Sequence, residues 1–217
     1  MTFHTVSTGW RAFDKLSYAK DINYEYPLKQ NMLKYYPKES AKYDTDAEPP
    51  ASTAKILDAV SKSAYDNDRA YEGCCRCVLD AIERHLRLVD DDKSFKAALK
   101  ASTGLAAGIA REGETCGALI GAIMAAGLVS GTEHLDDFQG YENTMEASGT
   151  IFDRFKSYYG TVCCSEIQKK LLGRRYDFRK EKDRKAWYKD GGLDACPGVC
   201  AVAARIGAEV VLKLKKM

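Results

Sequence analysis

The chain has 217 residues, which suits one large domain or a core domain with an appendage. Its 33 basic and 31 acidic residues leave a formal net charge of only +2, which argues against general binding to nucleic acids or to membrane surfaces. The longest apolar run, Cys116–Val129, is too short and too rich in glycine and alanine to span a bilayer. We therefore expect no nucleic-acid partner and no membrane span.

Residues 1–50 differ in composition from the rest of the chain. They contain many tyrosines, show little periodicity and end in Ala47-Glu48-Pro49-Pro50. A loosely ordered tail would need fewer tyrosines, so we expect an extended N-terminal arm that lies on the core or on a partner subunit. Residues 51–217 then form a second unit, which is helical and rich in cysteine.

From residue 51 onward, apolar residues recur with helical spacing, and no sustained alternation predicts a strand. Glycines interrupt the pattern at the expected helix ends. The predicted fold is all-α, an irregular multi-helix bundle. The predicted helices cover approximately residues 52–71, 74–89, 93–102, 114–130, 135–159, 161–172, 178–189 and 197–215, with Pro197 in the first turn of the last.

The chain has eight cysteines, many for a cytoplasmic protein but too few for a small disulfide scaffold. The first residues, Met1-Thr2-Phe3-His4, lack the basic and apolar regions of a signal peptide, so we expect a cytoplasmic location. In that reducing compartment, metal ligation or redox chemistry is the better interpretation. The cysteines are Cys74, Cys75, Cys77, Cys116, Cys163, Cys164, Cys196 and Cys200.

A single buried cysteine behaves as a small hydrophobic residue, but this set recurs where helices are predicted to begin. Helix N-termini offer free N–H groups and positive potential, which stabilise thiolates and lower the thiol pKa. The same N–H groups can also donate hydrogen bonds to the sulfur atoms of an iron–sulfur cluster. The cysteines at predicted helix starts are Cys74, Cys116, Cys163, Cys164 and Cys196.

The cysteine spacing excludes several known sites. The chain has no Cys-x-x-Cys-His sequence that could attach a haem and no ferredoxin run of cysteines, and only Cys74 and Cys77 have zinc-knuckle spacing.

His85 falls within the apolar arc of its predicted helix, where we expect a buried, hydrogen-bonded structural residue. The segment Gly117-x3-Gly121 lacks a phosphate-loop context and predicts close helix packing at the centre of the fold or at a subunit interface.

Four segments around cysteines stand out: Gly73–Leu79, Gly113–Ala122, Tyr159–Ile167 and Cys196 ahead of Val202-Ala203-Ala204. In these segments the chain resembles the redox-active family labelled by its cysteine pattern, C-GCAxxG-C-C. The resemblance covers residues 70–214, although the second motif here is Cys-Gly-Ala-x-x-Gly rather than Gly-Cys-Ala-x-x-Gly. The region from Cys164 to Cys196 also resembles the helical domain of split-Soret cytochromes, without their haem motif.

The resemblance implies an iron–sulfur cluster without haem, and a role in electron transfer. The ligands that it implies are Cys74, Cys116, Cys164 and Cys196, with Cys77, Cys163 and Cys200 as further cofactor-binding candidates. A redox partner protein and a homodimer are also expected.

Two alternatives remain open at this point. The close pairs Cys74/Cys77 and Cys196/Cys200 could instead cycle between dithiol and disulfide, with Cys116 as a low-pKa attacking thiol. A structural zinc site in an interaction module is the other alternative.

Overall fold

The computed structural model describes residues 51–216, so the predicted N-terminal arm lies outside the described residues. The described part is all α, as predicted, apart from one isolated β-bridge between Thr115 and Cys163. Its elements are α3 (Ala51–Tyr71), α4 (Cys74–Leu86), α5 (Asp92–Ser102), the 3₁₀-helix η1 (Thr103–Leu105), α6 (Gly117–Ser130), α7 (Phe138–Tyr159), α8 (Cys164–Leu172), α9 (Glu181–Lys189) and α10 (Gly192–Leu214).

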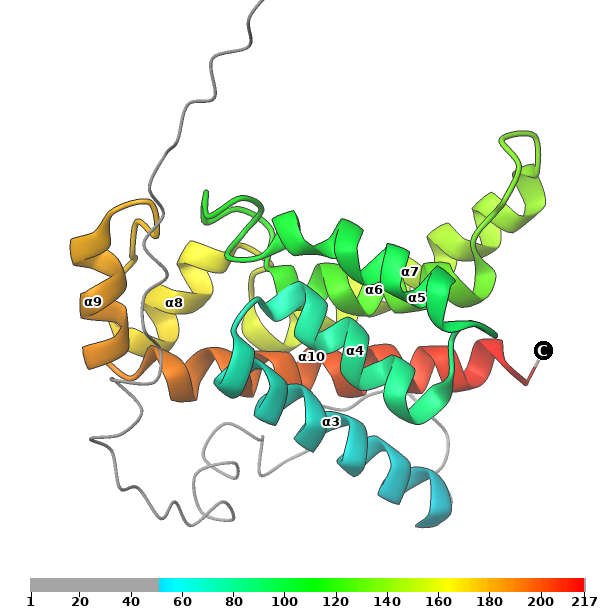
Figure 1. Cartoon of the computed structure of the whole chain (residues 1–217), viewed down its shortest axis with the longest axis horizontal. Coiled ribbons are helices and arrows are strands. Elements are labelled where there is room, and N and C mark those ends of the chain that lie inside the picture. Colours follow the sequence, from blue (N-terminus) through cyan, green and yellow to red (C-terminus); the bar gives the residue numbers. More distant parts are fainter. Residues whose placement is uncertain (1–50, 217) are drawn as a thin grey trace, which may run out of the picture.

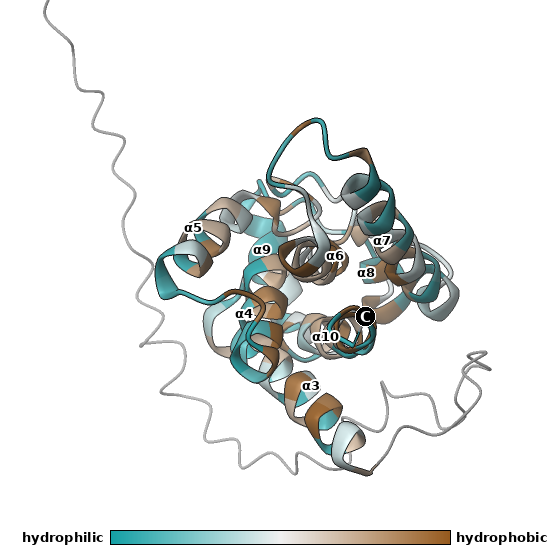
Figure 2. Cartoon of the chain, turned by 90° about the vertical axis from the view of Figure 1, so that its right-hand side faces the viewer, coloured by the Kyte–Doolittle hydropathy of each residue, from teal (hydrophilic) through white to brown (hydrophobic). Residues whose placement is uncertain are grey.

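Helix α10 runs through the middle of the bundle, and α3, α4, α6 and α7 pack around it (Figures 1 and 2). By length and composition alone it could cross a membrane, since its most apolar window has a mean hydropathy of 1.6. However, 78% of that window is buried inside the bundle. A helix that is apolar on all sides is typical of the core of a protein, so its packing accounts for its composition.

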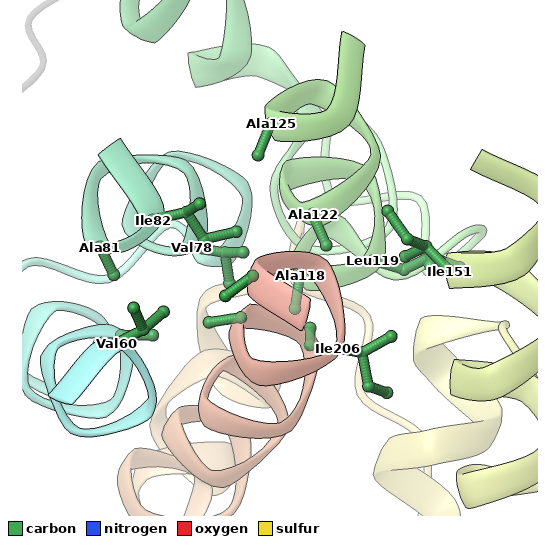
Figure 3. Close-up of a cluster of buried hydrophobic side chains, with 14 of the residues drawn as sticks. Val60, Val78, Ala81, Ile82, Ala118, Leu119, Ala122, Ala125, Ile151 and Ile206 are labelled. Carbon is green, nitrogen blue, oxygen red and sulfur yellow. The ribbon is translucent and has the colours of Figure 1, made fainter. Parts of the chain in front are cut away.

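Small residues allow α4, α6 and α10 to approach closely. A Cβ atom added at Gly121 would collide with the backbone oxygen of Cys75, and one at Gly207 would lie 2.9 Å from the Cβ of Ala122. Between these contacts, short aliphatic side chains fill the space (Figure 3). The glycine-rich helix α6 is therefore central, which is one of the two positions predicted from its sequence.

Helices α6 and α8 begin later than predicted because their preceding residues pair with each other. The Cys164 amide donates to Glu114 O at 2.6 Å, and the Cys116 amide donates to Val162 O at 2.8 Å. This short extended pairing occupies backbone groups that would otherwise join the helices. The starts of the two helices are thereby held side by side.

Helix α10 begins at Gly192, five residues before the predicted start at Pro197. A proline inside a helix leaves the carbonyl four residues earlier without its helical donor. Here that carbonyl belongs to Leu193, and it accepts a hydrogen bond from Arg69 Nη1 of α3 at 3.3 Å. Because α3 supplies the missing donor, the helix continues through the proline.

The prediction of a buried His85 is wrong. His85 is exposed, near the C-terminal end of α4, and its Nε2 lies 2.8 Å from Ser63 Oγ of α3. It is hydrogen-bonded, as expected, but at the edge of the α3–α4 contact rather than inside it.

Candidate functional site

A cavity of about 630 Å³ lies where α4, α6 and α10 begin, bounded by the end of α3 and by α8, α9 and the loop of residues 106–113. Four cysteines line this cavity, and each lies at or near the beginning of a different helix. We call these residues the cavity cysteines: Cys74, Cys116, Cys164 and Cys196. Of the seven predicted cofactor-binding cysteines, the structure therefore gathers four on one cavity, and Cys77, Cys163 and Cys200 do not line it.

The remaining cysteines, which we call the packed cysteines, donate hydrogen bonds to their surroundings. Each is satisfied by a backbone carbonyl or a thioether, as expected of a small buried donor. The thiols donate from Cys75 to Met124 Sδ (3.7 Å), from Cys77 to Glu72 O (3.3 Å), from Cys163 to Gly113 O (3.2 Å) and from Cys200 to Cys74 O (4.0 Å). No disulfide joins any of the eight cysteines.

Three of the cavity cysteines stand at helix starts, as predicted. Cys74 is the first residue of α4 and follows Gly73, whose φ of 93° makes the sharp turn out of α3. Cys116 is the residue that precedes α6, and Cys164 is the first residue of α8. The prediction for Cys196 is wrong, because it is the fifth residue of a helix that begins at Gly192.

Glycines bring the cavity walls close together at two places. A Cβ atom at Gly117 would lie 2.5 Å from Cys74 Sγ and 2.6 Å from Leu105 O, so only glycine lets the start of α6 meet the first cavity cysteine. A Cβ atom at Gly192 would overlap the indole ring of Trp187. The indole therefore lies directly against the start of α10 and faces the cavity.

The model of the C_GCAxxG_C_C family, described as "Putative redox-active protein", matches residues 71–210. The chain belongs to this family of redox-active proteins. The match includes all eight cysteines. Searches of curated proteins and of solved structures found no match.

In this C_GCAxxG_C_C protein, burial raises the pKa of every cavity cysteine. The thiol of Cys116 has a pKa of about 11, and those of Cys74 and Cys196 lie well above their usual value. Repulsion between the thiolates adds to the effect, which places these sulfur atoms within electrostatic range of one another. The prediction that Cys116 is a low-pKa attacking thiol is therefore wrong for the metal-free protein, because burial outweighs the helix N-terminus.

The N–H groups around these sulfurs act in the opposite direction. The backbone amides of Ala118 and Leu119 lower the pKa of Cys116, and that of Ala107 lowers the pKa of Cys74, in each case by less than burial raises it. Gln168 Nε2 donates to Cys164 Sγ at 3.3 Å. Each of these cysteines thus faces an N–H donor that would stabilise a thiolate.

The indole N–H of Trp187 completes this set. Trp187 is only 6% exposed, and its Nε1 has no hydrogen-bond partner of normal geometry among residues 51–216. It nevertheless lies close enough to Cys196 to lower the pKa of that thiol, against the larger effect of burial. A buried N–H without a full partner is costly unless an acceptor is supplied.

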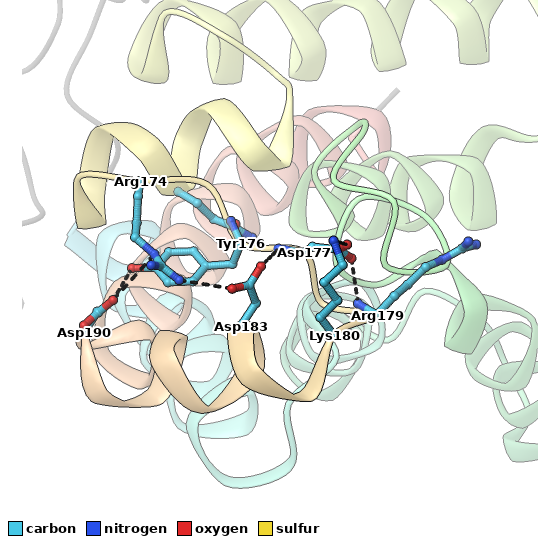
Figure 4. Close-up of polar contacts among 8 residues, drawn as sticks. Arg174, Tyr176, Asp177, Arg179, Lys180, Asp183 and Asp190 are labelled. Carbon is cyan, nitrogen blue, oxygen red and sulfur yellow. Dashed lines mark hydrogen bonds and ion pairs between the residues drawn. The ribbon is translucent and has the colours of Figure 1, made fainter.

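A polar network connects α9, the helix that carries Trp187, with the loop that precedes it (Figure 4). The Tyr176 hydroxyl donates to Asp190 at 2.9 Å, and the Arg174 guanidinium lies 4.5 Å from the centre of the Tyr176 ring. The Asp177 amide donates to Asp183 at 3.0 Å. These contacts fix the position of the loop between α8 and α9.

Gln168 and Trp187 were not among the predicted site residues. Gln168 follows Cys164 by four residues, a spacing that brings two side chains together on a helix. No sequence pattern connects Trp187 with Cys196. Within residues 51–216, no three Cys, His, Asp or Glu side chains converge closely enough to hold a single metal ion.

Proposed function

We propose that the cavity binds an iron–sulfur cluster and that the protein transfers electrons. The observation that carries this proposal is the gathering of the cavity cysteines from four separate helices onto one cavity, with an N–H donor facing each sulfur. Four cysteine thiolates are the ligand set of both [2Fe–2S] and [4Fe–4S] clusters.

The residues present fit such a group in two further respects. The indole N–H of Trp187 faces Cys196 without a hydrogen bond of normal geometry in the described residues, and the thiolate sulfur of a cluster ligand would be a stronger acceptor than a neutral thiol. The thiols also repel one another when ionised, so a cation is needed to hold them together as thiolates. A bound cluster supplies one-electron redox chemistry, while the chain holds it, excludes water from it and donates hydrogen bonds to its sulfur ligands.

The two alternatives have weaker support. A zinc ion would require the sulfurs to converge on one point, and the described residues show no such convergence. The four ligands of a cluster, in contrast, are distributed over two or four iron atoms. The pairs expected for thiol–disulfide exchange, Cys74/Cys77 and Cys196/Cys200, each combine one cavity cysteine with one packed cysteine, so neither pair forms a single site.

The test is the anaerobic ultraviolet–visible spectrum, with iron, sulfide and zinc analysis on the same purified sample. We expect visible absorbance that dithionite bleaches, and stoichiometric iron and sulfide. Colourless, iron-free protein from an anaerobic preparation, with no cluster after reconstitution, would contradict the proposal. Zinc in place of iron would favour the structural site.

Adjacent cysteines provide matched controls. We expect Cys164→Ser to remove most of the bound iron and Cys163→Ser to retain it, because only the first lines the cavity. The same contrast is expected between Cys74→Ser and Cys75→Ser. Equal iron loss within each pair would show that the cavity does not define the ligands.

This function has consequences for partners. A cluster that takes up an electron must pass it on, so we propose that the protein has a redox partner protein. We also propose that this chain itself carries no haem. We also propose a homodimer in the cytoplasm, and light scattering on the purified full chain tests the dimer.

A further inference from the structure

The outer part of the cavity is lined by basic and aromatic side chains rather than by thiols. Arg76 of α4, Arg111 of the 106–113 loop and Arg184 of α9 all line it, together with Tyr188. Arg76 and Arg184 are half-buried, and Arg111 is exposed. Positive charge from three separate elements therefore meets at one opening.

These arginines differ from most others in their pairing. Residues 51–216 contain 11 arginines, and seven of them form an ion pair with a carboxylate within 4.0 Å. The four that form none in this part of the chain are Arg76, Arg87, Arg111 and Arg184, and three of these line the cavity. A guanidinium without a carboxylate partner, held at a concave surface, is suited to bind a carboxylate or phosphate group.

Backbone contacts hold two of these guanidinium groups in place. Arg76 Nη2 donates to Tyr71 O at 2.8 Å, and Arg184 Nη1 donates to Phe178 O at 2.7 Å. Each arginine has five N–H donors, so several remain for a ligand. The side chains are thus positioned before a ligand arrives.

The third arginine is presented by an unusual backbone. All five residues from Ala107 to Arg111 have positive φ values, between 51° and 72°, and four of them are not glycine. Such conformations are strained and recur at ligand-binding sites, where the surrounding structure holds them. Here Glu112 forms an ion pair with Arg179, and Gly113 O accepts from the Ser165 amide at 2.9 Å.

Two carboxylates also line the cavity, but within residues 51–216 neither forms an ion pair within 4.0 Å with Arg76, Arg111 or Arg184. Asp68 is 5% exposed and raises the pKa of the cavity cysteines, which places it on their side of the cavity. Glu72 accepts a hydrogen bond from the Tyr188 hydroxyl at 2.8 Å. The described residues therefore leave the three guanidinium groups available to a ligand.

We propose that the outer part of the cavity binds a small oxyanion, a molecule with a carboxylate or phosphate group, on Arg76, Arg111 and Arg184. The whole cavity has a volume of about 630 Å³, in the range of small-molecule sites, and a concave site favours a metabolite-sized ligand over the flat surface of an acidic protein. The role of this anion as a redox substrate rests on the proposed function, whereas its binding does not.

The test is calorimetric titration of the full-length protein with succinate, with inorganic phosphate and with polyglutamate, with iron measured on each sample. We expect saturable binding of succinate or phosphate. Arg111→Gln, and Arg111→Gln combined with Arg184→Gln, should weaken it at least about tenfold, the loss expected for a hydrogen bond to a charged group. Arg87→Gln is the matched control, because Arg87 also lacks a carboxylate partner in the described residues but does not line the cavity.

Four results would overturn the proposal: no binding of either small anion, equal weakening by Arg87→Gln, binding of polyglutamate alone, or loss of iron from the arginine variants with unchanged anion affinity. The last result would show that the arginines stabilise the negative charge of the bound cluster and do not bind a separate anion. Iron-free protein that still binds the anion through Arg111 would support this site while contradicting the proposed cluster.

Discussion

The packed centre of the bundle and the cavity at its end are built from the same three helices, α4, α6 and α10. In the centre, Gly121 and Gly207 bring these helices into contact, and no space remains between them. At the end, Gly117 brings a backbone against a thiol instead, and a cavity of about 630 Å³ remains beside it. The centre therefore determines stability, and the cavity is free to carry chemistry.

The largest expected effect on stability lies in the centre. Phe155 of α7 is fully buried, so Phe155→Ala should lower the free energy of unfolding by about 3–5 kcal/mol. Phe138, at the start of the same helix, is 76% exposed, and Phe138→Ala should change it by less than about 0.5 kcal/mol. Urea denaturation measures both, and equal losses would contradict the assignment of the core.

Two glycines of α6 differ in the space around them, so alanine substitutions at these positions should have opposite effects on stability. Gly121→Ala should lower the free energy of unfolding by about 1–3 kcal/mol, because the added Cβ meets the backbone of α4. Gly127 has open space around it, so Gly127→Ala should raise that free energy by about 0.5–1 kcal/mol through helix propensity. Urea denaturation should show opposite signs, and destabilisation by both would contradict this packing.

A pH effect of intermediate size is expected from the packed cysteines. Burial, followed by the negative charge of Asp68, raises the pKa of the Cys77 thiol to about 12. Between about pH 8.5 and pH 12, the unfolded chain loses this proton while the folded chain keeps it, so stability falls as the pH rises, by up to about 1.4 kcal/mol per pH unit.

Cys77→Ala should therefore flatten the decline in stability of the metal-free protein between pH 8.5 and pH 10. Urea denaturation across this range measures the slope. An unchanged slope in the variant would show that Cys77 does not titrate as expected.

The smallest effect on stability is expected inside the cavity. Trp187→Phe removes an N–H without a full partner, which is stabilising, and part of a buried ring, which is destabilising, so the melting temperature of the metal-free protein should change little. If the cluster is bound, its reduction potential should become more negative, because a donor to a ligand sulfur is lost. Tyr141→Phe, at an exposed position of α7 that does not line the cavity, is the control, and an equal shift in potential from it would contradict a direct effect.

The sequence was sufficient to predict the helical fold, the central place of α6 and the four cysteines that meet in the cavity. These features depend on local periodicity and on motifs within single segments. The burial of the thiols depends on neighbouring helices, so their pKa values were predicted in the wrong direction. Trp187 and the three cavity arginines meet the cysteines only through tertiary contacts, which no local pattern records.

Pro197 has a consequence for how the cavity depends on α3. Because the proline leaves Leu193 O without a helical donor, the hydrogen bond from Arg69 Nη1 to this oxygen and the ion pair of the same arginine with Asp194 connect the N-terminal end of α10 to α3. Cys196 lies two residues after Asp194, so a neighbouring helix helps to fix the position of the fourth cavity cysteine.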